Sequence, residues 1–204
     1  MIPVQVKPEP VSFDTRVRRK GNAFLASEGV PSKASAFRNY WKRISQELYS
    51  AYDGVCAYTC TYLVGPGTVD HFLPKTKFPY LAYEWSNYRL ASERANQRKG
   101  ENTDLLDPFR IKKEWFILDF PSCLVVPGDA IPVKKLSAAQ KTIEVLKLND
   151  DDNLVQERCN IIMLFVDGSV RLDFLRQRHP FIAWELERQG LTTNPGNVFK
   201  RRTQ

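Results

Sequence analysis

The segment from Val69 to Gly100 contains the residues best suited to chemistry in this chain. An aspartate and a histidine are adjacent at Asp70 and His71, and two asparagines follow at Asn87 and Asn96. An imidazole, with a pKa of about 6.5, can take a proton from water at neutral pH. Carboxylate and amide oxygens are competent ligands for a hard cation such as Mg²⁺. A base beside a cation ligand is the combination that metal-dependent hydrolysis of a phosphodiester requires.

Basic residues accompany these positions. The candidates for contacts with phosphate groups are Lys75, Lys77, Arg89, Arg94, Arg98 and Lys99. The whole chain carries 30 Lys and Arg against 23 Asp and Glu, with a net charge of +7. This excess alone fits a polyanionic partner and a solvated surface equally well. Arg94, Arg98 and Lys99 lie within two helical turns of Asn96, and this position favours nucleic acid.

Local signals predict a strand, a loop and a second strand around Asp70. Residues 55–63 favour a strand, residues 65–67 form a turn, and residues 68–72 form a second short strand or its end. Residues 75–85 are expected to be a loop, because the prolines in and before this segment interrupt regular helix. Asp70 and His71 therefore lie on the second strand of this predicted pattern.

A short helix is predicted after this loop. Ser92 is a good N-cap for a helix that runs to Lys99, and Gly100 is a suitable C-terminal cap. Successive side chains of a regular strand point to opposite faces. Asp70 and His71 can therefore serve one site only at the end of a strand, where the backbone bends.

The string VDHFLPK, followed by EWSNYRLAS and ANQRKG, resembles the HNH endonucleases, which are also called His-Me finger or ββα-metal enzymes. The resemblance implies that His71 activates water and that Asp70 and Asn96 hold one Mg²⁺ ion, for which Mn²⁺ or another divalent cation can substitute. It implies that Asn87 orients the loop that carries the base. It also implies DNA as the substrate, with 5′-phosphate and 3′-hydroxyl ends as products.

The expected fold is α+β, with a ββα-metal (HNH) finger embedded in a mostly helical body that has a short additional β-hairpin. Residues 1–33 are expected to form an extended N-terminal arm, residues 34–191 a single nuclease domain, and residues 192–204 a basic tail. Within the domain, the core motif spans residues 55–100 and the helical shell spans residues 137–191.

Further elements are predicted outside the motif. Apolar residues at helical spacing predict a helix over residues 35–52, with its aromatic side chains in the core. A hairpin is expected from two short strands at residues 115–120 and 123–126. The remaining helices are predicted at residues 137–148, 152–166, 169–178 and 181–188.

The four cysteines are Cys56, Cys60, Cys123 and Cys159. In a cytosolic chain of this size they are expected to be reduced thiols rather than a disulfide framework. Many HNH proteins hold zinc between two cysteine pairs around the motif. Here only Cys56 and Cys60 are present, and Ser92 and Ala95 occupy the positions of the second pair. Two thiolates do not complete a tetrahedral shell, so structural zinc is not expected.

The sequence thus predicts a cytoplasmic, metal-dependent DNA endonuclease. No apolar run approaches the roughly 20 residues that span a bilayer, and the first residues show no signal-peptide pattern, so no membrane association is expected. Residues 105–109 (LLDPF) and 146–150 (LKLND) resemble the HNH component of Septu-type antiphage defence systems, which implies a defence or mobile-element role beside a partner ATPase. Two alternatives stay open: a nuclease subunit silent until such a partner activates it, and a nucleic-acid-binding module that does not cleave.

Overall fold

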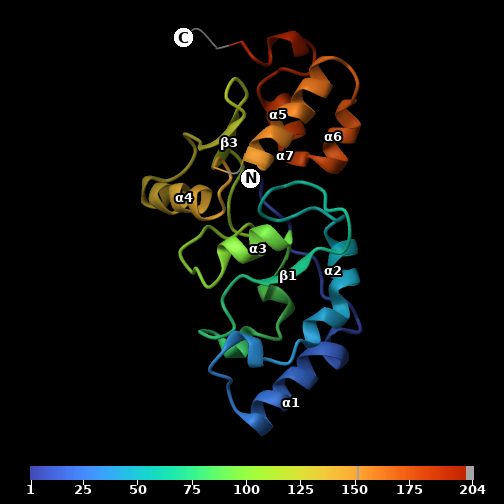
Figure 1. Cartoon of the computed structure of the whole chain (residues 1–204), viewed down its shortest axis with the longest axis vertical. Helices are drawn as coiled ribbons and strands as arrows, with labels where there is room; N and C mark the ends of the chain where they lie inside the picture. The colour runs from blue at the N-terminus through green and yellow to red at the C-terminus, as the bar shows by residue number, and fades with distance from the viewer. Residues whose placement is uncertain (151, 201–204) are drawn as a thin grey trace. The chain divides into compact units, whose positions relative to one another are not determined.

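The computed structural model describes residues 1–150 and 152–200, which divide into two compact units (Figure 1). The N-terminal unit comprises Gln5–Ala57 and Leu63–Thr103. The C-terminal unit comprises Met1–Val4, Tyr58–Tyr62 and the described residues from Asp104 onward. The sequence instead predicted one domain over residues 34–191. Residues 201–204, the end of the predicted basic tail, lie outside the described residues.

Two short segments explain why the units are discontinuous in sequence. The amide of Val4 donates to the carbonyl of Pro108 at 2.9 Å, and the amide of Tyr62 donates to the carbonyl of Arg178 at 2.8 Å. Both bonds join residues that are distant in the chain but belong to the C-terminal unit. Such long-range pairing leaves no local pattern in the sequence.

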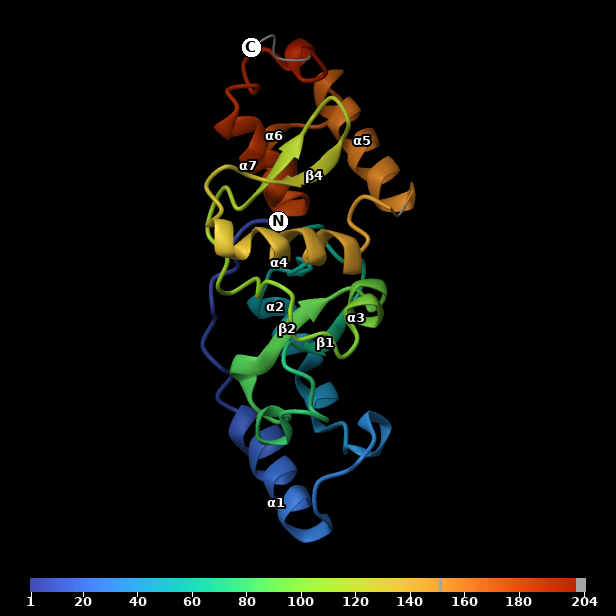
Figure 2. The ribbon, with the colours of Figure 1, turned by 90° about the vertical axis from the view of Figure 1, so that its left-hand side faces the viewer.

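An antiparallel hairpin and a short helix form the centre of the N-terminal unit (Figure 2). In the hairpin, Asp70 lies opposite Arg89 and His71 lies opposite Tyr88. The elements of this unit in chain order are η1 (Asp14–Arg18), α1 (Arg19–Glu28), η2 (Ala34–Ala36), η3 (Tyr40–Ile44), α2 (Ser45–Ala51), β1 (Thr68–His71), η4 (Pro79–Leu81), η5 (Trp85–Asn87), β2 (Tyr88–Ala91) and α3 (Glu93–Lys99).

The ends of α3 agree with the sequence. The hydroxyl of Ser92 accepts a hydrogen bond from the amide of Ala95 at 3.1 Å, which satisfies one of the first free donors of the helix. Gly100 ends the helix with a φ of 51°, a left-handed conformation that glycine adopts at low cost. The predicted cap, helix and stop are confirmed.

The predicted extended arm is wrong. Residues 14–28 are helical, first as the π-helix η1 and then as α1. Phe13 is fully buried, and its ring meets the rings of Trp85 and Tyr88 edge-on, with centroids 5.7 and 5.8 Å away. The guanidinium of Arg18 bonds both carboxylate oxygens of Glu84 at 3.1 and 3.0 Å. Long-range aromatic packing and this ion pair hold a segment whose many charges obscure its helical pattern.

Two further predictions in this unit need correction. The helix over residues 35–52 is α-helical only in α2, because the preceding residues form the 3₁₀ turns η2 and η3. Residues 55–63 form no strand, because a turn at residues 57–59 interrupts them. The backbone is left-handed at Asp53 and Cys60, with φ of 52° and 55°, and such residues interrupt an extended chain.

The C-terminal unit is a second hairpin with four α-helices in its described part, and this mixed composition agrees with the predicted α+β class. The hairpin and the helices lie close to their predicted positions. They are β3 (Phe116–Asp119), β4 (Leu124–Pro127), α4 (Val133–Val145), α5 (Asp152–Val166), α6 (Leu172–Arg178) and α7 (Pro180–Arg188), followed by the 3₁₀ turn η6 (Pro195–Asn197). No helix in the described part is both long and apolar enough to cross a lipid bilayer.

The prediction of reduced thiols fails for one pair. Cys123 and Cys159 form a disulfide whose Cα atoms are 5.7 Å apart. The bond joins the turn between β3 and β4 to α5, so the packing of these elements, rather than their separation in sequence, decides it. Cys56 and Cys60 form no disulfide, and both are buried.

Candidate active site

His71 is the last residue of β1, and its ring is held in one orientation. The Nε2 atom lies 2.9 Å from the carbonyl oxygen of Ala82, which only accepts hydrogen bonds. Nε2 therefore carries the proton, and in the neutral ring Nδ1 keeps its lone pair. The hydroxyl of Tyr88 donates to the same carbonyl at 2.9 Å. One backbone oxygen thus fixes both the tautomer of His71 and its cross-strand neighbour.

The surroundings of His71 disfavour its charged form. Burial, together with the ammonium groups of Lys75 and Lys99, lowers the pKa of His71 to about 3, while the hydrogen bond to Ala82 opposes the shift. The imidazole is therefore neutral at pH 7. A neutral ring with a free Nδ1 can accept a proton from water.

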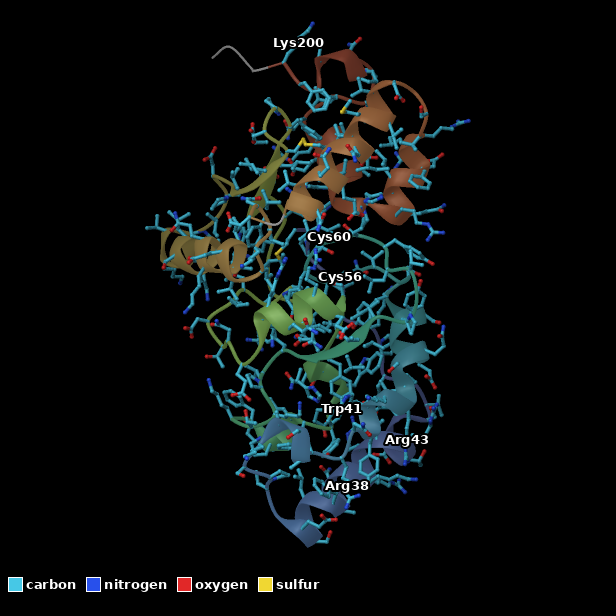
Figure 3. The ribbon with its side chains drawn as sticks, viewed as in Figure 1. Arg38, Trp41, Arg43, Cys56, Cys60 and Lys200 are labelled. Atoms are coloured by element: carbon cyan, nitrogen blue, oxygen red, sulfur yellow. A yellow bond between two sulfur atoms is a disulfide. The ribbon has the colours of Figure 1, made fainter. Side chains whose placement is uncertain are left out.

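Trp41, in η3, packs against this imidazole. The two rings meet edge-on with centroids 4.7 Å apart. The ammonium of Lys75 lies 5.1 Å from the centroid of the same Trp41 ring. Arg38 and Arg43 flank Trp41 in sequence and are exposed (Figure 3). The sequence assigned the aromatic residues of this segment to the core and overlooked a contact between Trp41 and His71.

Asp70 and its neighbour His71 point to opposite faces of β1, as adjacent residues of a strand do. The carboxylate of Asp70 lies 3.1 Å from the ammonium of Lys99, and the two side chains are 2% and 0% exposed. Lys99 also donates to the backbone carbonyl of His71 at 2.8 Å. The pair forms the predicted strand end, since the chain bends directly after His71.

Asn96 lies on the Asp70 face of the hairpin. Its Nδ2 donates to the hydroxyl of Thr68 at 3.1 Å, and Thr68 precedes Asp70 by two positions on β1, so both point to the same side. Within the described residues, the Oδ1 atom of Asn96 accepts no hydrogen bond. A carboxylate and a free amide oxygen fit a hard divalent cation, provided that the ammonium of Lys99 gives up Asp70.

Asn87 joins the two ends of the loop that follows His71. Its Oδ1 accepts from the amide of Leu73 at 2.8 Å. Its Nδ2 donates to the carbonyls of Leu73 and Leu81 at 2.9 and 3.2 Å. Leu81 precedes Ala82, whose carbonyl holds His71. Asn87 is buried and fully engaged with backbone, which is the contact pattern expected of a residue that orients this loop.

The six basic candidates differ in their exposure to solvent. Arg94 and Lys77 are exposed, while Lys75 and Arg98 are half-buried. Arg89 and Lys99 are buried, which differs from the expectation that they face phosphate groups. Arg89 donates to the carbonyls of Ser86 and Tyr88 at 2.8 and 3.0 Å, so it stabilises the turn into β2.

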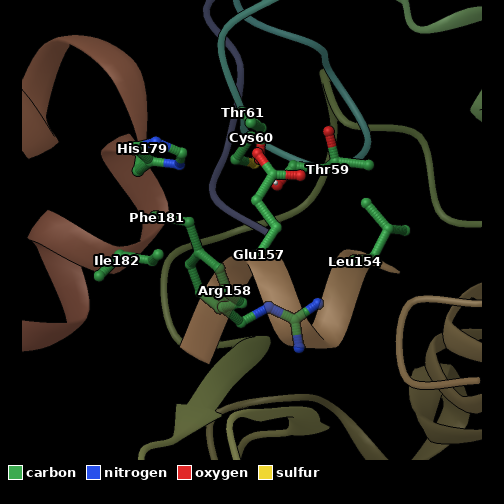
Figure 4. A pocket seen from close by; sticks show the side chains of 9 residues that line it. All are labelled: Thr59, Cys60, Thr61, Leu154, Glu157, Arg158, His179, Phe181 and Ile182. Carbon is green, nitrogen blue, oxygen red and sulfur yellow. Dashed lines mark hydrogen bonds between the residues drawn. The ribbon is translucent and has the colours of Figure 1, made fainter. Parts of the chain in front are cut away.

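A second candidate site lies in the C-terminal unit (Figure 4). Cys60, Glu157 and His179 are among the residues that line a cavity of about 20 Å³ there. Such a volume holds about one water molecule and no substrate. The described residues contain no cluster of three or more His, Cys, Asp or Glu side chains arranged to hold a metal ion. Because the cavity in the C-terminal unit has no room for a substrate, the hairpin site of the N-terminal unit is the stronger candidate.

No protein-family model matches the chain, and no curated protein shows significant similarity to it.

Proposed function

We propose that the chain is a metal-dependent endonuclease of the HNH type that hydrolyses phosphodiester bonds of DNA. One observation supports this most strongly: His71 ends β1 as a neutral, oriented imidazole, and Asp70 and Asn96 lie together on the opposite face of the hairpin. The reaction needs a base and oxygen ligands for a cation, and these can approach one phosphate from different directions at the end of β1. In this proposal, β1, β2 and α3 form the ββα-metal motif.

His71 is the base of the proposed reaction. Nδ1 takes a proton from the attacking water, and the carbonyl of Ala82 stabilises the resulting imidazolium through Nε2. The low pKa of His71 applies to the protein without bound substrate. A phosphate anion near Lys75 compensates the positive charge around the ring and thereby raises the pKa of His71 toward the range of an effective base.

Asp70 and Asn96 are the proposed ligands of one divalent cation, Mg²⁺ or Mn²⁺. When bound, the cation offsets negative charge on the scissile phosphate and on the leaving oxygen. Asp70 supplies the anionic ligand, and Asn96 supplies a neutral oxygen while its Nδ2 remains on Thr68.

Exposed and half-buried cations of the N-terminal unit are the proposed contacts for DNA. Arg94, Arg98, Lys75 and Lys77 come from the motif, and Arg38 and Arg43 flank Trp41. Contacts of this kind bind phosphates and fix the register of the duplex without carrying sequence information. DNA binding of low sequence specificity is therefore expected.

The decisive experiment is cleavage of supercoiled plasmid with Mg²⁺, Mn²⁺ or EDTA. The wild type should nick the plasmid only with metal, and His71→Ala should bind DNA without cutting it. His179→Ala is the matched control, because it removes the other histidine of the chain, which belongs to the C-terminal unit. Metal-independent cutting, or cutting by His71→Ala, would contradict the proposed mechanism.

A second candidate is a nuclease subunit that stays silent until a partner, such as an ATPase, activates it. The pairing of Asp70 with Lys99 favours it, because a carboxylate that already has a cation is not ready to bind another. Plasmid binding without cutting by the wild type would support this candidate or a non-cleaving module. A role in antiphage defence is proposed on the resemblance of residues 105–109 and 146–150 alone.

A further inference from the structure

Lys99 is a buried cation for which the proposed reaction has no use. Its side chain is fully inaccessible, and its ammonium contacts three oxygen atoms. These are the Asp70 carboxylate at 3.1 Å, the His71 carbonyl at 2.8 Å and the Gly100 carbonyl at 3.4 Å. An ammonium and a carboxylate are both costly to bury alone, so each stabilises the other in this environment.

This arrangement resembles a cation site in its chemistry. One positive charge is surrounded by a carboxylate and backbone carbonyl oxygens, which are also the ligands that hard metal ions prefer. Asn96 lies three residues before Lys99, so both project from the same side of α3 toward β1. The lysine therefore occupies the place beside Asp70 where a divalent cation would have to bind.

We infer that Lys99 is a resident cation, which holds Asp70 in place in the metal-free protein and competes with a divalent cation for that carboxylate. This inference rests on the proposed function, since it concerns the regulation of the same site. A metal ion added beside an intact pair would meet a like charge in a poorly solvated environment. Metal binding therefore requires the ammonium to leave Asp70, and the affinity for metal is reduced accordingly.

The end of α3 allows this exchange. Lys99 is the last residue of the helix, and the left-handed Gly100 follows it. The ammonium sits on a flexible chain of four carbons, so it can move without unwinding the helix. Asn96, in the preceding turn, keeps its bond to Thr68.

The test is calorimetric titration of Mn²⁺ into the full chain without DNA. Lys99→Met should bind Mn²⁺ more tightly than the wild type by a factor on the order of ten to a hundred, which is the usual range for coupling between competing ligands. Lys33→Met, which removes an exposed lysine far from Asp70 in sequence, should leave the affinity unchanged. Asp70→Asn should abolish binding in both the wild-type and the Lys99→Met background.

The outcomes separate this inference from the proposed function. Equal or weaker binding by Lys99→Met, with binding still lost in Asp70→Asn, would overturn the competition and leave the metal site standing. No binding by either protein, or binding that survives Asp70→Asn, would overturn the metal site and the inference with it.

Lys99→Met removes the ammonium beside a buried carboxylate and can therefore unfold the chain. Lys99→Gln, which is neutral but can still donate to Asp70, is then titrated with Mn²⁺ in its place. Its affinity for Mn²⁺ should exceed that of the wild type by the same factor. Thermal unfolding adds a readout: Mn²⁺ should raise the Tm of either Lys99 variant more than that of the wild type. An equal rise in all three proteins would contradict the inference.

Discussion

Asn87 is joined to Leu73 by two hydrogen bonds, one to the amide at 2.8 Å and one from Nδ2 to the carbonyl at 2.9 Å. Leu73 follows His71 by two residues, and Asn87 also bonds Leu81, which precedes the carbonyl that holds the His71 ring. One side chain therefore controls both ends of the loop that positions the proposed base.

Asn87→Ala should lower the rate of DNA cleavage by about 10²-fold, because a shift of about 1 Å in a catalytic group has an effect of this size. The Mn²⁺ affinity of the protein should stay near the wild-type value, since Asp70 and Asn96 are untouched. Single-turnover cleavage and metal titration measure the two effects. Asn87→Asp keeps the acceptor for Leu73 and should lose less activity. Equal losses in rate and metal affinity would show that Asn87 supports the whole site.

The buried His71 makes stability depend on pH. The pKa of His71 is lowered to about 3 in the fold, mainly by burial, against about 6.5 in the unfolded chain. Between these values only the unfolded chain binds the proton, so the free energy of unfolding falls as the pH decreases from 6.5. At pH 5, this effect of His71 lowers the free energy of unfolding by about 2 kcal/mol, because each pH unit below 6.5 costs about 1.4 kcal/mol.

Urea unfolding in EDTA at pH 7 and pH 5 measures this contribution. His71→Gln should lose less stability between the two pH values than the wild type does, by about 2 kcal/mol. Other titrating groups are common to both proteins and cancel in the comparison. An identical loss in both proteins would show that His71 is protonated in the folded state at pH 5.

The N-terminal segment should contribute strongly to stability. Phe13 is fully buried against Trp85 and Tyr88, so Phe13→Ala should lower the free energy of unfolding by about 3–5 kcal/mol. Val11→Ala is the control, because Val11 lies two residues away and is fully exposed. Thermal or urea unfolding provides the measurement. Equal stability of the two variants would mean that this segment does not dock on the unit.

Arg94→Ala should weaken binding to all DNA sequences to a similar extent, and the slope of log affinity against log salt should decrease by about 1. Arg94 is exposed in the first turn of α3 and was proposed as a phosphate contact. Arg110→Ala removes an exposed arginine of the C-terminal unit and should leave the slope unchanged. Fluorescence anisotropy over a range of salt concentrations tests both. A loss confined to one sequence would assign Arg94 to base recognition.

The elements that local chemistry specifies were predictable from the sequence. Ser92 and Gly100 define the ends of α3 because capping depends on a few adjacent residues. The hairpin of β3 and β4 and the helix α5 also lie where short-range patterns place them. Residue type and spacing alone also predicted the candidate site residues, which are Asp70, His71, Asn87 and Asn96.

Only the tertiary structure decided which partners these side chains meet. The sequence assigned Lys99 and Arg89 to the surface as cations, whereas folding buries both. The Asp70 carboxylate and the His71 carbonyl, which are distant in sequence, compensate the charge of Lys99. Arg89 donates to nearby backbone carbonyls at the start of β2. The docking of Phe13 and the disulfide between Cys123 and Cys159 likewise depend on residues far apart in the chain. Residue type and spacing thus determined the candidate chemistry, and long-range packing determined its charge environment, since desolvation and ion pairing depend on contacts that no local pattern contains.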